Sequence, residues 1–191
     1  MKHKLSILLI TVVAFTSYNC FNGPDDPIEE VKKVSEKCEP KWWEKNLVKE
    51  NKIYGNGFGL AVMDKAVAKD LSYQNAILDI NSQLRSRVIS NLDKNYESVF
   101  TGIDNKIVND FVSGIRQNVR SKTDDECQGC IRIKFVDCVE NNYVAAYSLV
   151  ELDFEGWKKN IEKGIYDEEM EKASDQIKAQ RDKFYESMGL D

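Results

Sequence analysis

The apolar pattern that begins at Met63 constrains the fold more than any other feature of the chain. Apolar side chains recur there at spacings of three, four or seven residues, which is one face of a long amphipathic helix. Asp64 stands at its start, where an acidic side chain favours the helix dipole. The residues of the predicted face are Ala66, Tyr73, Ile77, Ile80, Leu84, Val88 and Leu92.

A glycine-rich strand is predicted just before this helix, over Ile53 to Val62. Its Gly55, Gly57 and Gly59 indicate that another part of the chain packs closely against the strand, either the Trp42-Trp43 segment or the long helix. After Gly102 a second helical stretch is expected, followed by a polar loop over 120–129. Its predicted apolar face consists of Ile103, Ile107, Phe111, Ile115 and Val119.

The rest of the chain predicts a hairpin and further helices. Asn141-Asn142 is a plausible two-residue turn, because asparagine tolerates positive φ, and a return strand follows over 143–154. Gly156-Trp157 opens a short helix, and Gly164 is expected to separate it from a charged helix over 167–188. Alternation predicts that the first hairpin strand buries one face, made of Ile131, Ile133, Phe135 and Val139.

Together these elements predict an α+β fold: a small antiparallel sheet packed against a long amphipathic helix, with an extra C-terminal helix. The main domain is assigned to residues 41–163 and the charged C-terminal helix to residues 164–191. The charged helix has a narrow apolar stripe that could pack on the domain or on a partner, formed by Met170, Ala173, Ile177, Phe184 and Met188.

The N-terminus has the features of a secretory signal peptide. Lys2, His3 and Lys4 precede an apolar run over residues 5–15, and polar residues follow up to Cys20. The run is shorter than the ~20 apolar residues that a transmembrane helix needs. Its end resembles a bacterial lipobox, in which the cysteine thiol is acylated and becomes the new N-terminus.

This interpretation divides the N-terminal region into a signal peptide over residues 1–19 and a tether over residues 20–40, in which a short helix over 28–34 is possible. Ser17 and Asn19 depart from the usual lipobox, which has leucine and a small residue at these positions. Ordinary secretion and an uncleaved anchor are the alternatives. The lipidated form would sit in the outer membrane of a bacterial envelope, on a periplasmic or surface face that the sequence leaves open.

Charge and histidine content limit the function. The formal net charge is −5 and the signal peptide would remove two lysines, which argues against nucleic acid and anionic lipid headgroups as main partners. Membrane attachment would therefore come from several acyl chains on Cys20. The only histidine is His3, so the mature chain would lack Ser-His-Asp and Cys-His catalysis and histidine-ligated metal sites. The sequence favours a non-enzyme; a carboxylate enzyme is the weaker alternative.

Four further cysteines form an even set once Cys20 is acylated: Cys38, Cys127, Cys130 and Cys138. In an exported protein they predict structural disulfides. Of the three possible connectivities we favour one that closes the Cys127–Cys130 loop and ties Cys38 to Cys138. A redox pair, a four-cysteine zinc site and free thiols are the alternatives.

The remaining candidate sites are weak. Trp42 and Trp43 point oppositely if they are extended, so one is expected to cover the sheet and the other to face outward as an interaction candidate. The glycines at 55, 57 and 59 lack the spacing of a dinucleotide fingerprint. Acid-rich stretches at 124–126 and 167–171 lack the ligand alternation of a calcium loop. No cofactor or metal site is expected.

Three parts of the chain resemble the Lpp-twenty family of bacterial outer-membrane lipoproteins. They are Pro40-Lys41-Trp42-Trp43, the strand start Ile53-Tyr54-Gly55-Asn56-Gly57 and the long helix. The hairpin over 131–154 is similar to the strand pair that closes the family's domain. The resemblance covers residues 40–155 and implies a lipoprotein without catalytic residues, whose partners are envelope or flagellar proteins and which could form homo-oligomers. The alternative is a lipid-anchored periplasmic module for a small ligand or glycan.

Overall fold

The computed structural model describes residues 27–43, 51–124 and 127–190. Cys20 and the predicted signal peptide lie outside the described residues. The chain divides into two compact units, residues 1–38 and residues 39–191, and each is described by itself. No helix of the described residues is long and apolar enough to cross a membrane.

The first unit contains one described helix, α2 (Pro27–Cys38). It begins at a proline, which suits the first helical position because the missing N–H would have no intrahelical partner there. The predicted short helix over 28–34 is confirmed and extended by one turn. Much of the predicted tether over 20–40 is therefore helical.

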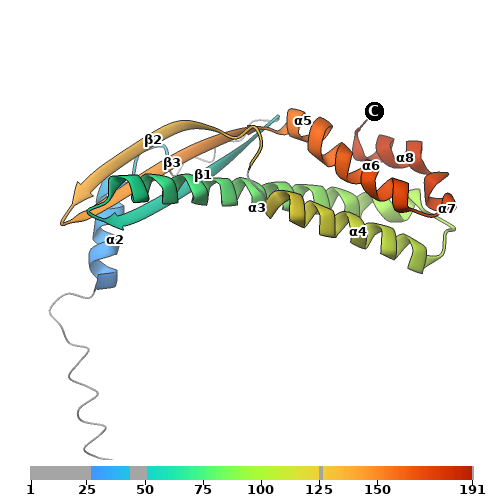
Figure 1. The fold of residues 1–191 in the computed structure, drawn as a ribbon, viewed down its shortest axis with the longest axis horizontal. Helices are drawn as coiled ribbons and strands as arrows, with labels where there is room; N and C mark the ends of the chain where they lie inside the picture. The colour runs from blue at the N-terminus through green and yellow to red at the C-terminus, as the bar shows by residue number, and fades with distance from the viewer. Residues whose placement is uncertain (1–26, 44–50, 125–126, 191) are drawn as a thin grey trace, which may run out of the picture. The chain divides into compact units, whose positions relative to one another are not determined.

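The second unit is built on a three-stranded antiparallel sheet, which confirms the predicted α+β class. Its strands are β1 (Lys52–Val62), β2 (Ile131–Glu140) and β3 (Tyr143–Asp153), in the order β1-β3-β2 (Figure 1). Asn141 and Asn142 join β2 to β3 with φ of 48° and 68°. Positive φ at both turn residues is what a two-residue hairpin requires, so the predicted turn is confirmed.

The long helix α3 (Lys65–Val99) begins where the sequence predicts. The Asp64 side chain accepts a hydrogen bond from the backbone N–H of Val67 at 3.0 Å and so caps the helix. Figure 1 shows that α3 runs along the sheet and continues beyond it into a helical region. One uninterrupted helix therefore belongs to both parts of the unit.

The glycines of β1 let α3 approach the sheet at backbone distance. A Cβ atom added at Gly55, Gly57 or Gly59 would lie 2.1, 1.9 and 2.1 Å from carbonyl oxygens of α3. The close neighbour of the glycine strand is thus the long helix, one of the two possibilities that the sequence left open. The carbonyls belong to Ala76, Ser72 and Ala68, respectively.

This close approach also corrects the predicted helix face. In the first three turns the buried residues are Ala68, Ser72 and Ala76, whereas Ala66 is exposed and Tyr73 half-buried. Only small side chains fit between two backbones this close, so the larger Tyr73 is displaced to the side. From Ile80 onward the predicted face is correct, because Ile80, Leu84, Val88 and Leu92 are all buried.

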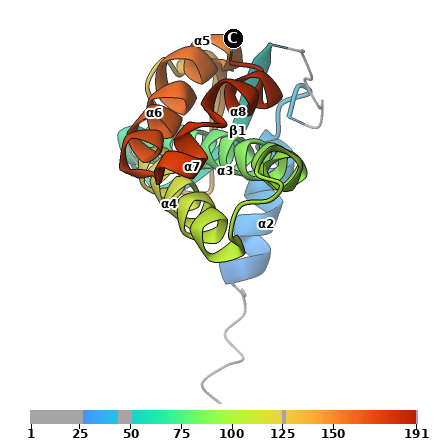
Figure 2. The same ribbon diagram turned by 90° about the vertical axis from the view of Figure 1, so that its right-hand side faces the viewer.

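Beyond the sheet, α3 packs against α4 (Asn105–Asp124) and the C-terminal helices (Figure 2). Phe184 lies at the centre of this region, with its ring centroid 5.6 Å from those of both Phe100 and Phe111. The buried stripe of α4 extends from Phe111 through Ile115 to Val119, as predicted. However, α4 continues to Asp124, so half of the loop predicted over 120–129 is helical. Thr123 is buried there and donates to the Val119 carbonyl at 2.8 Å.

The C-terminal region differs from the predicted short helix followed by one charged helix. Three helical segments follow one another without a break: α5 (Phe154–Trp157), the π-helical η1 (Lys158–Glu162) and α6 (Lys163–Lys172). Gly164 lies inside α6, where burial of Ile165 and Tyr166 outweighs the ~1 kcal/mol that a helical glycine costs.

The break comes later, at Ala173, whose extended ψ of 160° ends α6. Ser174 then caps α7 (Asp175–Lys178), and α8 (Arg181–Met188) follows and ends at Gly189, whose φ is 66°. The apolar stripe predicted for one helix is therefore distributed over three. Most of its members, Met170, Ile177, Phe184 and Met188, are buried in the unit's own core.

Candidate functional site

The outer hairpin strand β2 does not bury the face that its alternation predicts. Ile131, Ile133 and Val139 are 65, 42 and 65% exposed. The reason is topological: α3 packs mainly on β1 and β3, so β2 extends past the helix as an edge strand. Val136, on the same strand, is 37% exposed, and Phe135 is half-buried.

The opposite edge of the sheet is covered by side chains of α3. Asn75 donates to the Phe58 carbonyl at 2.7 Å, and Gln83 donates to the Tyr54 carbonyl at 2.7 Å. Between them, Asp79 accepts from the Asn56 backbone N–H at 3.0 Å. Four helical residues rise about 6 Å and two strand residues about 6.8 Å, so side chains four apart on α3 match alternate residues of β1. This edge is closed to further pairing.

On the β2 edge, the strand pairing of the described residues is with β3, while Cys138 of this strand is disulfide-bonded and Glu140 has a partner of its own. A register shift between Arg132 and Lys134 marks a bulge near its start. Bulges and charged residues on edge strands limit uncontrolled pairing. The regular part of the edge is therefore residues 134–140, which begin with the cationic Lys134 and end with the anionic Glu140.

Several cations of this region lie on aromatic rings. The Arg132 guanidinium is 4.3 Å from the Tyr73 ring centroid and 5.5 Å from that of Phe135. On the other face, the Lys134 ammonium is 5.9 Å from the Trp42 ring centroid. Lys65 pairs with Asp137 at 2.8 Å.

The two tryptophans do not separate into one buried and one outward-facing residue. Trp43 packs edge-on against Tyr147 at 5.0 Å between centroids, and Trp42 packs against Trp43 at 6.1 Å. Both are half-buried. Trp43 therefore covers β3 in the way predicted for one of the pair, and burial raises the pKa of Tyr147 to about 12. Trp42 contributes its ring to the β2 side of the unit.

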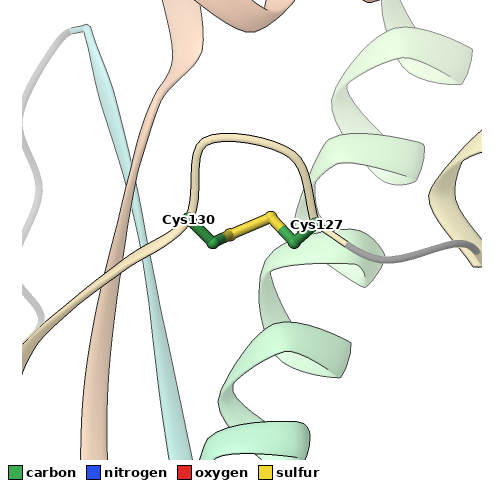
Figure 3. The surroundings of a disulfide bond; sticks show 2 residues. All are labelled: Cys127 and Cys130. Carbon is green, nitrogen blue, oxygen red and sulfur yellow. A yellow bond between two sulfur atoms is a disulfide. The ribbon is translucent and has the colours of Figure 1, made fainter.

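The predicted use of the four cysteines in disulfides is confirmed. Cys127 is bonded to Cys130 across the loop between α4 and β2 (Figure 3), and Cys38 and Cys138 are also disulfide-bonded. A zinc–thiolate set is therefore not formed. The Cys127–Cys130 pair follows the C-terminal end of α4, whose partial negative charge disfavours a reactive thiolate. Among the described residues no group of three or more metal-ligating side chains comes together.

The structure also contains an open pocket beside this disulfide, with a volume of about 270 Å³. Its buried lining includes Asn81 of α3, Trp157 of α5 and Ile165 of α6. Its exposed side chains are polar and belong to Lys122, Gln128, Asn160 and Glu168; Gly164 is exposed beside them. A second hollow of about 280 Å³ shares four of the lining residues, Gln128, Trp157, Asn160 and Ile161.

Sequence reasoning missed this pocket. One signal was present: Asn81 follows Ile80 on the buried side of a helix that is otherwise apolar there. The π-helical segment contributes Asn160 and Ile161 to the lining, and its residue types do not distinguish it from an α-helix.

Comparison with known proteins identifies no relative: no family model, no curated protein and no solved structure matches the chain.

Proposed function

We propose that this chain is an exported envelope protein, held to a bacterial outer membrane by acyl chains on Cys20, which acts by binding other proteins and not by catalysis. The open β2 edge supports the contact function. The confirmed disulfides support export, since such bonds persist in oxidising compartments. The anchor is inferred from the signal sequence, and the Lpp-twenty resemblance adds envelope or flagellar assemblies as the setting.

An exposed sheet edge binds partners by adding a strand. Unpaired backbone N–H and C=O groups supply the hydrogen bonds, and alternate side chains supply specificity. On β2, Ile133, Val136 and Val139 add exposed apolar area to the edge. Three α3 side chains already form hydrogen bonds with the outer edge of β1. A strand from a partner would therefore pair with β2.

The favoured partner strand is β2 of a second copy. In an antiparallel pair centred on Asp137, Lys134 of each copy faces Glu140 of the other, and Phe135 faces Val139. Opposite charges and aromatic–aliphatic neighbours across strands each stabilise pairing by ~0.2–1 kcal/mol. The two Asp137 carboxylates would meet at the axis, where Lys65 of each copy already pairs with them at 2.8 Å. Anchoring on one membrane raises the effective concentration of both copies.

A charge exchange tests this pairing. Analytical ultracentrifugation of the detergent-solubilised mature protein should show a dimer that Lys134→Glu weakens and that the double variant Lys134→Glu/Glu140→Lys restores. A partner of different sequence would not follow the exchange, so failure of the double variant to recover would exclude the second copy. If Ile133→Lys and Val139→Lys leave every association of the protein unchanged, the β2 edge is not the contact surface.

The anchor requires its own experiment. Intact-mass spectrometry of protein extracted from a bacterial envelope should find a chain that starts at Cys20 and carries several acyl groups. Cys20→Ser should be released from the membrane fraction. A mature chain that starts at another residue and carries no lipid would remove the membrane assignment while leaving the β2 contact to be tested separately.

A further inference from the structure

We propose that the pocket between α3, η1, α6 and the Cys127–Cys130 loop is a binding site for a small uncharged polyhydroxylated ligand, of the size of one sugar unit. This goes beyond the proposed contact function, because the pocket is lined by residues of α3, α4, the disulfide loop, α5, η1 and α6, none of which belongs to β2.

Asn81 is the main observation. Its residue surface is 94% buried, since only 6% is exposed, and it lines the pocket. Its side-chain amide makes no hydrogen bond with any described residue, although an amide has two donor hydrogens and an accepting oxygen. The amide nitrogen and oxygen are not sealed in the core: within the described residues, the buried side-chain N and O atoms that lack a partner are Asn56 Oδ1 and Arg132 Nε. The Asn81 amide therefore opens into the pocket and fits a ligand that both accepts and donates hydrogen bonds.

The other lining groups favour an uncharged ligand. Gln128 and Asn160 add two more amides, each able to donate and accept, as hydroxyl groups require. The two charged residues, Lys122 and Glu168, are of opposite sign. The Glu168 carboxylate already accepts a hydrogen bond from Lys172 at 2.8 Å, which with its charge lowers the pKa of Glu168. It is therefore not free to bind the ammonium group of a zwitterion.

The apolar part of the lining suits the ring of a sugar. Trp157 is 7% exposed and lines both hollows, with Ile161 beside it. Small-molecule sites combine such apolar walls with a few polar groups that fix the orientation of the ligand. A volume of about 270 Å³ accommodates one six-membered ring with its hydroxyl groups. The hollow that shares Trp157 and Asn160 leaves room for a second unit.

The π-helical segment η1 supplies part of the pocket. A π-turn is strained compared with an α-turn and occurs often at functional sites. Here the segment Lys158–Glu162 interrupts an otherwise α-helical run and contributes Asn160 and Ile161 to the lining. This is an observation independent of Asn81 that points to the same place.

The test uses the full mature chain with its disulfides intact and measures thermal unfolding with and without added ligand. Glucose and N-acetylglucosamine are the sugar probes; alanine and acetate stand for a zwitterion and an anion. A sugar at roughly tenfold its Kd should raise the Tm by about 3–5 °C. Alanine and acetate should leave it unchanged. A shift with either of these two, or none with the sugars, overturns the assigned ligand class.

The variant Asn81→Leu tests whether the side-chain amide of Asn81 binds the ligand. It replaces the amide with an apolar group of the same branching, so the sugar-induced shift should be lost, while the Tm without sugar should change little because the amide has no hydrogen bond within the protein to lose. Asn95→Leu is the matched control on α3: Asn95 donates to the Asn91 carbonyl at 2.9 Å, so this variant should lower the Tm and keep the sugar response.

The exposed Asn160→Ala provides a second variant that does not depend on the core of α3. It should reduce the sugar response while leaving the Tm of the free protein nearly unchanged. If Asn81→Leu keeps the full sugar response, or lowers the Tm as Asn95→Leu does, the amide is not a ligand group and the proposal fails. Lys134→Glu should bind sugar normally, which separates this test from that of the β2 contact.

Discussion

The two halves of α3 solve the same packing problem in opposite ways. In the first half, Ala68, Ser72 and Ala76 hold the helix backbone against the glycines of β1. In the second half, larger side chains from Leu84 to Val99 fill the space between α3 and the surrounding helices. The first half packs closely because the β1 glycines have no side chains, and the second half is held by large buried side chains. We therefore expect added side-chain atoms to destabilise the first half and removed side-chain atoms to destabilise the second.

Removing volume from the second half should have the largest effect. Phe184 is fully buried and packs against Phe100, Phe111 and Tyr166, with ring centroids 5.2–5.6 Å away. Phe184→Ala should lower the free energy of unfolding by ~3–5 kcal/mol, since it removes transfer energy and leaves a cavity. Urea denaturation measures this loss.

The control for this change is Leu78→Ala, at a side chain of α3 that is 62% exposed. It should stay within ~0.5 kcal/mol of the natural protein. Equal losses for the two variants would mean that the aromatic cluster does not hold the second half together.

Adding one carbon to the first half should have the next largest effect. A Cβ at Gly57 would lie 1.9 Å from the Ser72 carbonyl oxygen, so a backbone must move. Gly57→Ala should therefore lose ~3 kcal/mol by overpacking. The same substitution at Gly164, where no atom lies within 4 Å of the added carbon, should gain up to ~1 kcal/mol from helix propensity.

Gly57→Ala should lower the urea midpoint of unfolding, and Gly164→Ala should raise it. A Gly57→Ala variant as stable as the natural protein would show that α3 does not approach β1 at backbone distance.

Opening the closed edge of the sheet should have a smaller effect on stability. Asn75→Ala removes the hydrogen bond to the Phe58 carbonyl and should lose ~1 kcal/mol or less. It also leaves a strand carbonyl free, so light scattering at high concentration should rise as edges associate. The exposed neighbour Gln74→Ala should change neither quantity. If Asn75→Ala scatters no more light than Gln74→Ala, the α3 side chains do not protect this edge.

The smallest effect is a change in pH dependence. Glu162 is 2% exposed, and its burial raises its pKa above the ordinary value of 4.5. The Tyr166 hydroxyl, which donates to the carboxylate at 2.8 Å, and the charge of Lys158 lower this pKa. The charge of Glu155 raises it further, and the net shift is upward. The folded state therefore keeps this proton to higher pH than the unfolded chain. The associated stability is present below pH 4.5 and is lost as the pH rises through the folded pKa.

Glu162→Gln should remove this component, so that stability relative to the natural protein increases between pH 4 and pH 7 in urea titrations. The exposed Glu171→Gln is the control and should give a constant difference. A constant difference for Glu162→Gln as well would contradict the raised pKa.

The sequence predicted what short-range patterns determine. The start of α3 at Asp64, the Asn141-Asn142 turn and the three strands follow from capping, positive φ and residue type, and the structure has each of them. The errors arose where tertiary packing decides. Alternation predicted that Ile131 and Val139 are buried, but the residues of a strand do not determine whether that strand lies at the edge of the sheet. Gly164 was predicted to end a helix because glycine has a low helix propensity. The burial of Ile165 and Tyr166, which offsets this cost, depends on the folded structure and could not be predicted from the local sequence.

The candidate sites divide in the same way. The disulfide cysteines followed from their even number and the expected compartment, whereas the pocket depends on a π-turn and on Asn81, which only the assembled helices bring together. One of Trp42 and Trp43 was expected to cover the sheet and the other to face outward. Their neighbours Tyr147 and Lys134 come from a hairpin about a hundred residues further along the chain, which the local sequence does not indicate.

The unbroken length of α3 has a mechanical consequence. Its 35 residues span about 52 Å, with no loop at the junction between the two halves. The second unit therefore lacks a flexible joint along this axis, and a load applied at the hairpin is carried through helical hydrogen bonds to the aromatic cluster. The helix therefore fixes the distance between its start beside β1 and its end beside the aromatic cluster.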